Sequence, residues 1–151
     1  MKLVIQRVKN ASVSVDGECL SKIGPGLLIL CGVGHDDTPF DACFLAKKTA
    51  NLRVFEDDDG KMNLSVKDIG GEILSVSQFT LYGDCTKGNR PSFINAARPE
   101  SGESLFNEYV QALDKLGFLP NTGKFGADMK VDLLNDGPVT LIMESTGRTK
   151  V

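Results

Sequence analysis

The segment SQFTLYGD, residues 77–84, places the polar side chains of Ser77, Gln78 and Thr80 in a run that otherwise has the composition of a β-strand. Buried polar side chains destabilise a fold unless they are hydrogen-bonded, so such a cluster is either satisfied by its neighbours or kept to meet a ligand. Because a serine or threonine hydroxyl can serve as a nucleophile when a base takes its proton, the segment raises the question of where that base would be.

A base for either hydroxyl is hard to find in this sequence. The only histidine, His35, lies far upstream in a turn-like segment, and Ser77 belongs to neither a Gly-x-Ser-x-Gly elbow nor a Ser-x-x-Lys pair. In a regular strand Ser77 and Thr80 would also point to opposite faces, so they could share a pocket only across a bulge. The pattern favours a site that positions its substrate, offers backbone amides to an oxyanion and lets the substrate supply the reactive group.

A second unusual segment is NDGPVT, residues 135–140. Asn, Asp, Gly and Pro all favour turns, and proline commonly opens a strand, so a turn between two strands is one interpretation. The other is a backbone wall for a ligand. A cis peptide before proline costs only about 0.5 to 1 kcal/mol, and Gly137 would let backbone carbonyls approach a ligand closely. Composition alone favours the turn.

The charge distribution limits the kinds of partner. A net charge of -3 argues against a strong non-specific grip on nucleic acid, which normally requires a basic surface. A local basic patch is still allowed in the loop-like stretch CTKGNRPSFINAARP, which contains Lys87, Arg90 and Arg98. On charge alone, an ordinary solvated loop is the better interpretation of this stretch.

Length and composition indicate one globular domain, residues 1–151. With 151 residues and 41% hydrophobic content, the chain can bury one sizeable core. No apolar run approaches a membrane span, and the N-terminus becomes polar too early for a secretory signal, so a cytoplasmic protein is expected. The four cysteines contain no Cys-x-x-Cys pair and predict buried thiols rather than a zinc site or disulfides. No metal and no cofactor are expected.

The first half of the chain predicts three strands and a helix around these segments. Strands are expected at 2–8 and 12–15, with a hairpin turn at Asp16-Gly17. The apolar run LLILCGV, residues 27–33, is typical of a central strand buried on both faces. Thr38 as N-cap followed by proline predicts a helix that continues to about Leu52.

The second half predicts further strands around a second helix. Short strands flank an acidic turn at Asp59-Gly60, and a longer strand covers residues 72–82. Apolar residues at helical spacing predict a helix from about Ser101 to Gly117. Strands at 128–134 and 139–145 would be joined by NDGP. The order β-β-β-α-β-β-α-β-β is of the α/β (α+β) class, with a mixed, mostly antiparallel sheet and two main helices.

Together, SQFTLYGD and NDGPVT closely resemble the two signature motifs of the D-aminoacyl-tRNA deacylases, the D-tyrosyl-tRNA deacylase family. The similarity runs nearly end to end, through MKLVIQRV, GEILSVSQFTLYGD, GNRPSF and TGKFGADM. The departures, such as Gly83 and the Gly24-Pro25-Gly26 turn, affect no residue given a role below. The resemblance implies the fold of that family, a single domain with a barrel-like core.

The activity that the resemblance implies is hydrolysis of the ester between a D-amino acid and the terminal adenosine of tRNA. Glycine mischarged on tRNA-Ala would also be removed. Members of the family are homodimers, and Gly137 and Pro138 would form a Gly-cisPro pair that one subunit inserts into the pocket of the other. Their carbonyl oxygens would hold the amino group and leave no room for an L side chain, which is selectivity by rejection.

The resemblance also implies roles for other residues. Ser77, Gln78 and Phe79 would surround the scissile ester, with the Phe79 amide as oxyanion donor. Thr80 is a nucleophile candidate by residue type, but the missing base suits the family's use of the tRNA 2'-hydroxyl. Arg7 and Met129 would border the pocket or the adenosine.

Lys87 and Arg90 would contact tRNA phosphates, and the acidic net charge would keep that binding weak and transient. A dimeric aminoacyl-tRNA or RNA-binding module without catalysis, in which NDGPVT is purely structural, is the alternative function.

Overall fold

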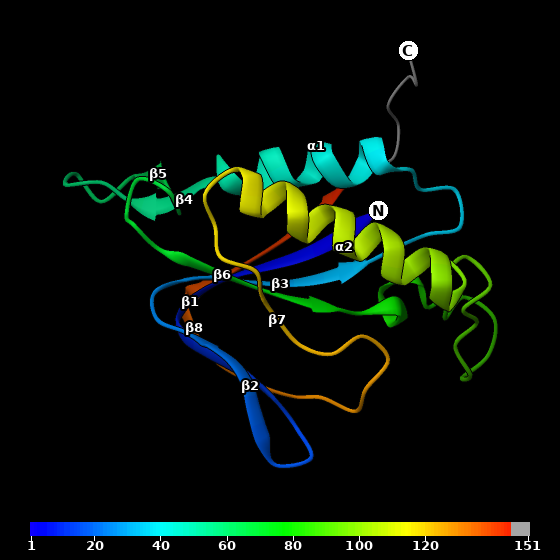
Figure 1. The fold of residues 1–151 in the computed structure, drawn as a ribbon. Coiled ribbons are helices and arrows are strands. Elements are labelled where there is room, and N and C mark those ends of the chain that lie inside the picture. Colours follow the sequence, from blue (N-terminus) through cyan, green and yellow to red (C-terminus); the bar gives the residue numbers. More distant parts are fainter. Residues whose placement is uncertain (146–151) are drawn as a thin grey trace.

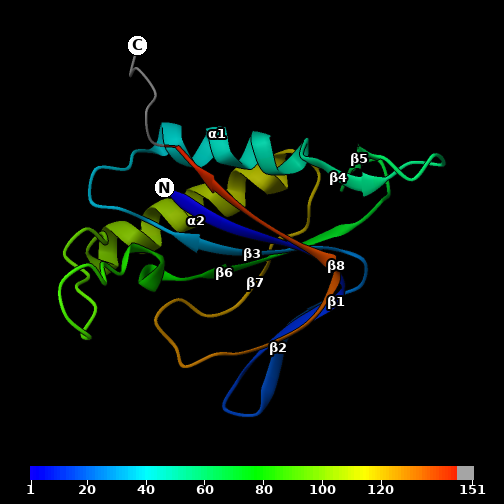
Figure 2. The ribbon, with the colours of Figure 1, turned by 180° about the vertical axis from the view of Figure 1, so that it is seen from behind.

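The computed structural model describes residues 1–145, in which two helices lie side by side over one face of a bent sheet (Figure 1). The view from behind also places α1 (Pro39–Ala50) and α2 (Pro99–Lys115) on the same face (Figure 2). The larger core lies between these helices and strands β1 (Lys2–Val15) and β3 (Gly26–Gly32). A smaller apolar cluster lies between the hairpin of β1 and β2 (Glu18–Ile23) and strands β6 (Glu72–Ser77) and β8 (Lys130–Glu144). The expected domain, 1–151, extends beyond the described part of the chain, since residues 146–151 lie outside it.

The main sheet is mixed and nearly barrel-shaped, as predicted for the α/β (α+β) class. Its strands run in the order β2-β1-β3-β6-β7, and β8 pairs with the other edge of β1. Pairs that involve β1 are antiparallel, whereas β3–β6 and β6–β7 are parallel. The strand bounds are β1 Lys2–Val15, β2 Glu18–Ile23, β3 Gly26–Gly32, β6 Glu72–Ser77, β7 Asn121–Thr122 and β8 Lys130–Glu144.

Strand β1 is continuous, so the prediction of two strands separated at Lys9 and Asn10 is wrong. One half of β1 pairs with β3 and the other half with β2, while β8 pairs along most of its length. Asn10 is held in the strand by its pairing opposite Leu134 of β8. The predicted hairpin turn is present, and Asp16 and Gly17 both have positive φ angles, of 51° and 81°, as a two-residue type I′ turn requires.

Both helices form where the sequence predicts them. The backbone amide and hydroxyl of Thr38 donate to the Asp41 carboxylate at 2.9 and 2.7 Å, which fixes the start of α1. The helices are joined inside the core by a 3.0 Å hydrogen bond between the hydroxyls of Thr49 and Tyr109. In the described residues, no helix is long and apolar enough to cross a membrane.

Two details outside the main sheet complete the fold. Strands β4 (Arg53–Glu56) and β5 (Met62–Ser65) form the predicted hairpin, with Gly60 at a φ of 75° in its turn. The prediction that all four cysteines are buried is wrong. Only Cys31, on the central strand β3, is buried, whereas Cys19, Cys43 and Cys85 are exposed, and all four are free thiols.

Candidate functional site

The end of β6 is where the first polar segment begins. β6 stops at Ser77, and residues Phe79–Tyr82 form the 3₁₀-helix η1. The predicted strand over residues 72–82 is therefore wrong beyond Ser77. The neighbouring strand β3 ends at Gly32. The last hydrogen bond between the two segments is donated by the Gln78 amide to the Cys31 carbonyl, at 2.8 Å.

Gly32 is also the reason the chain can turn there. A Cβ atom on Gly32 would lie 3.0 Å from the Gln78 carbonyl oxygen and 3.0 Å from the Leu81 Cβ. Only a residue without a side chain lets η1 fold this closely over the end of β3. Because η1 replaces the strand, the strict alternation that separated Ser77 from Thr80 no longer applies.

A pocket of about 560 Å³ opens beside this turn. It lies between the ends of β3 and β6, the start of α2 and the loop that precedes β8. Of the candidate site residues, Ser77, Gln78, Phe79 and Met129 line it, whereas Thr80 does not. The remaining lining is mostly apolar or small: Cys31, Val33, Val76, Phe93, Ala96, Ala97, Pro99, Gly102, Phe125, Gly126, Ala127, Asp128 and Val131.

The polar side chains at the pocket can form hydrogen bonds, but none is arranged to take a proton from a hydroxyl. The Gln78 side-chain amide donates to the Thr80 hydroxyl. Among the described residues, no histidine, lysine or carboxylate is hydrogen-bonded to the hydroxyl of Ser77 or Thr80. Burial raises the pKa of the Cys31 thiol to about 12, so the thiol stays protonated and is a poor nucleophile. The one carboxylate in the described lining, Asp128, accepts hydrogen bonds from the Lys130 ammonium at 3.0 Å and is bonded to neither hydroxyl.

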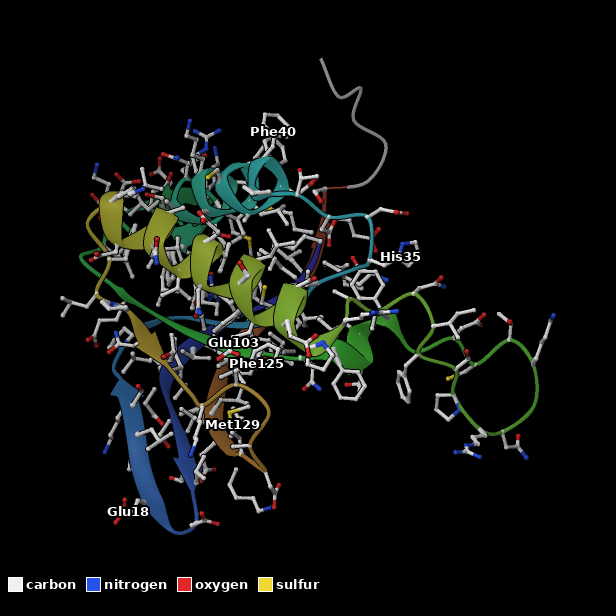
Figure 3. The ribbon with its side chains drawn as sticks, turned by 45° about the vertical axis from the view of Figure 1, so that its right-hand side comes forward. Glu18, His35, Phe40, Glu103, Phe125 and Met129 are labelled. Atoms are coloured by element: carbon white, nitrogen blue, oxygen red, sulfur yellow. The ribbon has the colours of Figure 1, made fainter. Side chains whose placement is uncertain are left out.

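Aromatic rings form two walls of the pocket. Phe79 on η1 and Phe93 meet edge to face with ring centroids 5.2 Å apart. On the other side, the Phe125 ring lies near Phe106 of α2 and close to Gly102, where a Cβ atom would come within 3.4 Å of the ring. Figure 3 shows Phe125 and Met129 on the segment below α2. Sequence reasoning noticed TGKFGADM only as a family motif and missed Phe93, Gly102, Phe125 and Asp128 as pocket residues.

The second unusual segment is a bulge in a continuous strand, and the predicted turn between two strands is wrong. β8 pairs with β1 through Asn135 opposite Val8 and Thr140 opposite Gln6, so residues 136–139 lie opposite the single residue Arg7. The Gly137-Pro138 peptide bond in this bulge is cis. Neither residue lines the pocket of its own chain.

Arg7 braces this bulge and does not line the pocket. Its guanidinium is buried and donates to the Asp136 carbonyl at 3.0 Å and to the Val54 carbonyl at 2.7 Å. The Asn135 side-chain amide fixes the neck of the bulge by donating to the carbonyls of Arg7 and Val139, both at 2.9 Å. Gly137 and Pro138 are therefore presented on a rigid support.

The surface beside the bulge is apolar. β8 pairs only with β1 among the strands of residues 1–145, which leaves its other edge without a partner strand. Leu134, Leu141 and Ile142 are exposed on this strand, Ile142 by 71%. An unpaired strand edge that carries exposed large apolar residues is typical of a surface that another chain covers.

Lys87 and Arg90 lie in an exposed loop that begins beside the pocket. The loop is closed by reciprocal backbone hydrogen bonds between Asp84 and Ser92, at 2.8 and 2.9 Å. Phe93, which lines the pocket, follows the loop directly. The two residues predicted to contact phosphates therefore lie on a loop that extends from the edge of the pocket into solvent.

Comparisons with known proteins agree with this architecture. A family model described as D-Tyr-tRNA(Tyr) deacylase matches residues 4–144. A protein of Geobacillus sp. (strain WCH70), named D-aminoacyl-tRNA deacylase, is 58% identical and covers 96% of this chain and 95% of its own. A protein of the same name from Desulfatibacillum aliphaticivorans is also 58% identical and covers 96% of this chain and 99% of its own.

Two solved structures share the fold. One, a c-Myc DNA unwinding element binding protein, has a TM-score of 0.90 and 46% identity, over 96% of this chain and 99% of that chain. The other, described as a probable eukaryotic D-amino acid tRNA deacylase, has a TM-score of 0.78 over 95% of this chain and 98% of that chain. Its 15% identity supports the fold alone.

Proposed function

The chain belongs to the D-Tyr-tRNA(Tyr) deacylase family, and we propose that it hydrolyses D-aminoacyl-tRNA in the pocket beside Ser77. It is a D-aminoacyl-tRNA deacylase, a hydrolase of the ester between the amino acid and the tRNA. The observation that supports this location is the polar end of β6 opening into a largely apolar pocket where, within residues 1–145, no base is hydrogen-bonded to the Ser77 or Thr80 hydroxyl. At about 560 Å³ the pocket falls within the range typical of small-ligand sites.

The pocket walls suit the terminal adenosine of the tRNA. Phe79, Phe93 and Phe125 offer aromatic faces and edges to the base, as stacking sites for unpaired nucleotides do. With the adenosine among these rings, the ester faces Ser77 and Gln78. Met129 closes the side of the pocket toward β8.

The chemistry is substrate-assisted. Water attacks the ester carbonyl, the tetrahedral oxyanion accepts a hydrogen bond from the Phe79 amide, and the proton that the water loses passes through the 2'-hydroxyl to the leaving ribose 3'-oxygen. The Phe79 amide begins η1, where an amide has no partner in a preceding turn and is free to donate. The neighbouring 2'-hydroxyl of the ribose orients the water, Ser77 and Gln78 hold the ester, and Thr80 fixes the Gln78 side chain by accepting its hydrogen bond. The products are the D-amino acid and free tRNA.

The protein acts as a homodimer, with one domain per subunit spanning residues 1–151. The pocket lacks a wall that could read chirality, while each chain presents Gly137 and Pro138 on a braced bulge outside its own pocket. The apolar edge of β8 next to that bulge supports a partner subunit that receives it. The inserted carbonyls hold the amino group and exclude an L side chain, so D-amino acids and glycine on tRNA-Ala are removed. Lys87 and Arg90 contact tRNA phosphates.

Incubating the protein with D-Tyr-tRNA and L-Tyr-tRNA and following ester loss tests the activity. Faster loss of the D ester is expected, and equal rates would contradict selectivity. Glycyl-tRNA-Ala tests the wider substrate range. A D-aminoacyl-tRNA whose terminal 2'-hydroxyl is replaced by hydrogen should be cleaved more slowly, and undiminished cleavage would exclude a catalytic role for that hydroxyl.

The shared site is tested by mixing two inactive variants. A pocket variant, Gln78→Ala, and a bulge variant, Gly137→Val, are refolded together in equal amounts. In a two-fold symmetric dimer about half of the random dimers are mixed and each contains one intact site, so about a quarter of the wild-type activity should return. If each chain builds its own complete site, no activity returns.

A further inference from the structure

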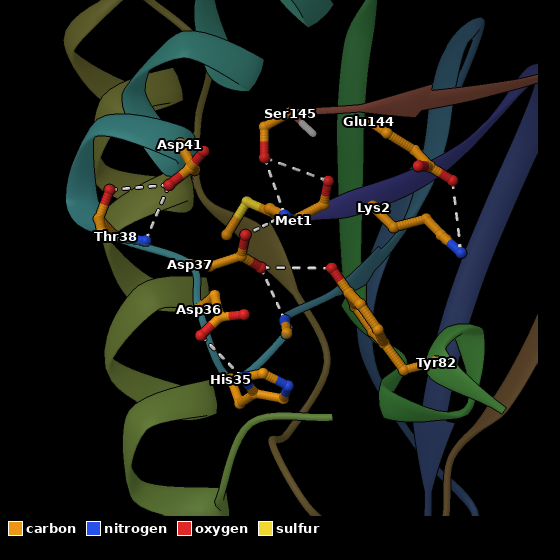
Figure 4. Close-up of polar contacts among 11 residues, drawn as sticks. Met1, Lys2, His35, Asp36, Asp37, Thr38, Asp41, Tyr82, Glu144 and Ser145 are labelled. Atoms are coloured by element: carbon orange, nitrogen blue, oxygen red, sulfur yellow. Dashed lines mark hydrogen bonds and ion pairs between the residues drawn. The ribbon is translucent and has the colours of Figure 1, made fainter. Parts of the chain in front are cut away.

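The Asp37 side chain connects Met1, at the start of the chain, to the 3₁₀-helix η1 beside the candidate site (Figure 4). Its carboxylate accepts hydrogen bonds from the Met1 amino group, from the Gly34 amide at 2.6 Å and from the Tyr82 hydroxyl at 3.3 Å. The Asp37 side chain is only 10% exposed. A buried carboxylate with several donors is held in one position, so any group bonded to it is also held.

Tyr82, the last residue of η1, is held on several sides. A Cβ atom on Gly34 would lie 2.8 Å from the Tyr82 Cζ atom and 2.8 Å from its hydroxyl oxygen, so the ring passes closely over a glycine. The Lys2 ammonium lies 5.3 Å from the ring centroid on another side. Burial, reinforced by the charge of Asp37, raises the pKa of the Tyr82 hydroxyl above its ordinary value, so the hydroxyl remains a donor.

Apart from Tyr82, η1 is fixed by a small number of contacts. Phe79 meets Phe93 edge to face, and the Lys2 ammonium donates to the Leu81 carbonyl at 3.5 Å. None of the η1 residues is buried, and Phe79 is 58% exposed. At one end, the chain is tied to the sheet by the Gln78 amide bond to the Cys31 carbonyl. At the other end, Tyr82 is tied to Asp37. The orientation of the residues between these two points therefore depends on both of them.

We propose that Asp37 and Tyr82 are positioning residues for deacylation: they hold η1 so that the Phe79 amide and the Gln78 side chain face the scissile ester. Neither residue lines the pocket, so both act through η1. This inference rests on the proposed location of the site.

The expected effect is on kcat rather than on KM. The groups on η1 act on the reacting carbonyl, whereas much of the wall that binds the adenosine, including Gly102 and Phe125, belongs to other elements. Tyr82→Phe keeps the ring in its slot and removes one hydrogen bond. One such bond corresponds to a fall in kcat of about 2- to 10-fold, with KM nearly unchanged.

The other tyrosine provides a matched control. Tyr109 also makes one side-chain hydrogen bond, to Thr49, but inside the core between the helices. Tyr109→Phe therefore removes the same kind of bond away from the pocket. Tyr109→Phe should lower thermal stability and leave kcat unchanged. Tyr82→Phe should lower kcat and leave thermal stability nearly unchanged.

A double-mutant cycle tests whether the two residues act together. Asp37→Asn and Tyr82→Phe should each lower kcat for D-Tyr-tRNA, and the double variant should be no slower than the slower single variant. Additive losses would contradict a shared role. Equal kcat values for wild type, Tyr82→Phe and Tyr109→Phe would overturn the proposal.

Amide hydrogen exchange gives a readout that is independent of activity. The amides of Gln78, Leu81 and Gly83 should exchange faster in Tyr82→Phe than in wild type, and Tyr109→Phe should leave them unchanged. If the wild-type protein fails to cleave D-Tyr-tRNA, the proposed function fails while exchange still tests the positioning of η1. If exchange at these amides does not change, the positioning role is wrong even in an active enzyme.

Discussion

Arg7 is expected to be the main support of the Gly137-Pro138 bulge, and its replacement by alanine should destabilise the protein measurably. The buried guanidinium donates to the carbonyls of Asp136 and Val54. Hydrogen bonds to a charged group contribute about 1.5 to 3 kcal/mol each, so even the lower value predicts a loss of about 3 kcal/mol in the free energy of unfolding. For a chain of this size, that corresponds to a fall in Tm of about 6 to 12 °C.

Lys9 is the matched control for this substitution, because its ammonium lies 3.3 Å from the Asp136 carboxylate that Arg7 also approaches, at 3.7 Å. The Lys9 side chain is 61% exposed, so Lys9→Ala should change stability by no more than about 0.5 kcal/mol. Arg7→Lys keeps the charge but can replace only part of the hydrogen bonding. Its loss of stability should lie between those of Arg7→Ala and Lys9→Ala.

Thermal unfolding followed by circular dichroism, at one fixed subunit concentration, measures all three variants. Hydrolysis of D-Tyr-tRNA is then measured at a temperature at which every variant is folded, and Arg7→Ala should be slower than wild type because its bulge has lost its support. If Arg7→Ala and Lys9→Ala unfold at the same temperature, the bracing role of Arg7 is refuted.

Three further predictions concern the pocket and the loop beside it. Thr80→Ala should retain activity within about tenfold, because the Thr80 hydroxyl only accepts a hydrogen bond from Gln78; complete loss in a steady-state deacylation assay would restore Thr80 as nucleophile. Gly32→Ala should lower kcat, since its Cβ atom would press on the Gln78 carbonyl at 3.0 Å and displace η1; an unchanged kcat would show that η1 tolerates displacement. Lys87→Ala and Arg90→Ala should each raise KM for tRNA and reduce the slope of log affinity against log salt by about 0.7 to 0.9. The same slope as in wild type would show that these residues touch no phosphate.

Local signals in the sequence predicted those elements whose stability is local. The Thr38 cap and the apolar spacing of α2 produced the two helices, and Asp16-Gly17 produced the hairpin turn. Each of these depends on residues that are close in sequence. The central strand β3 was also predicted, because a continuous apolar run indicates burial on both faces.

The errors in the placement of strands and turns occur where a distant segment decides the conformation. Lys9 and Asn10 have turn-forming types, yet β8 from the other end of the chain keeps them in an extended strand. The chain leaves β6 after Ser77 because β3 ends at Gly32, which no residue near Ser77 reveals. NDGP forms a bulge rather than a turn because β1 continues past it and Arg7 fills the space opposite.

The pocket follows the same rule, since its walls come from segments that are far apart in the sequence. Ser77 and Gln78 were identifiable because polar residues within an apolar strand need an explanation, whereas Phe79 was singled out by the family resemblance. Phe93 and Phe125 were not, because an aromatic residue in a loop has no local pattern that separates a pocket wall from a core contact. Gly102 is informative only once the Phe125 ring is seen beside it.

The proposed division of the site between two surfaces would explain how a chain with so few catalytic groups can be selective. The pocket supplies mostly apolar walls with hydrogen-bonding groups from Ser77 and Gln78. The bulge supplies a backbone fixed by the side chains of Arg7 and Asn135, and Gly137 and Pro138 do not line the pocket of their own chain. Only a rigid surface can distinguish D- from L-amino acids by steric exclusion. Backbone fixed by buried hydrogen bonds is more rigid than a side chain that can change rotamer. In the dimer that we propose, placing that backbone on a partner subunit makes dimerisation a condition of selectivity, whereas the ester-holding groups stay within one chain.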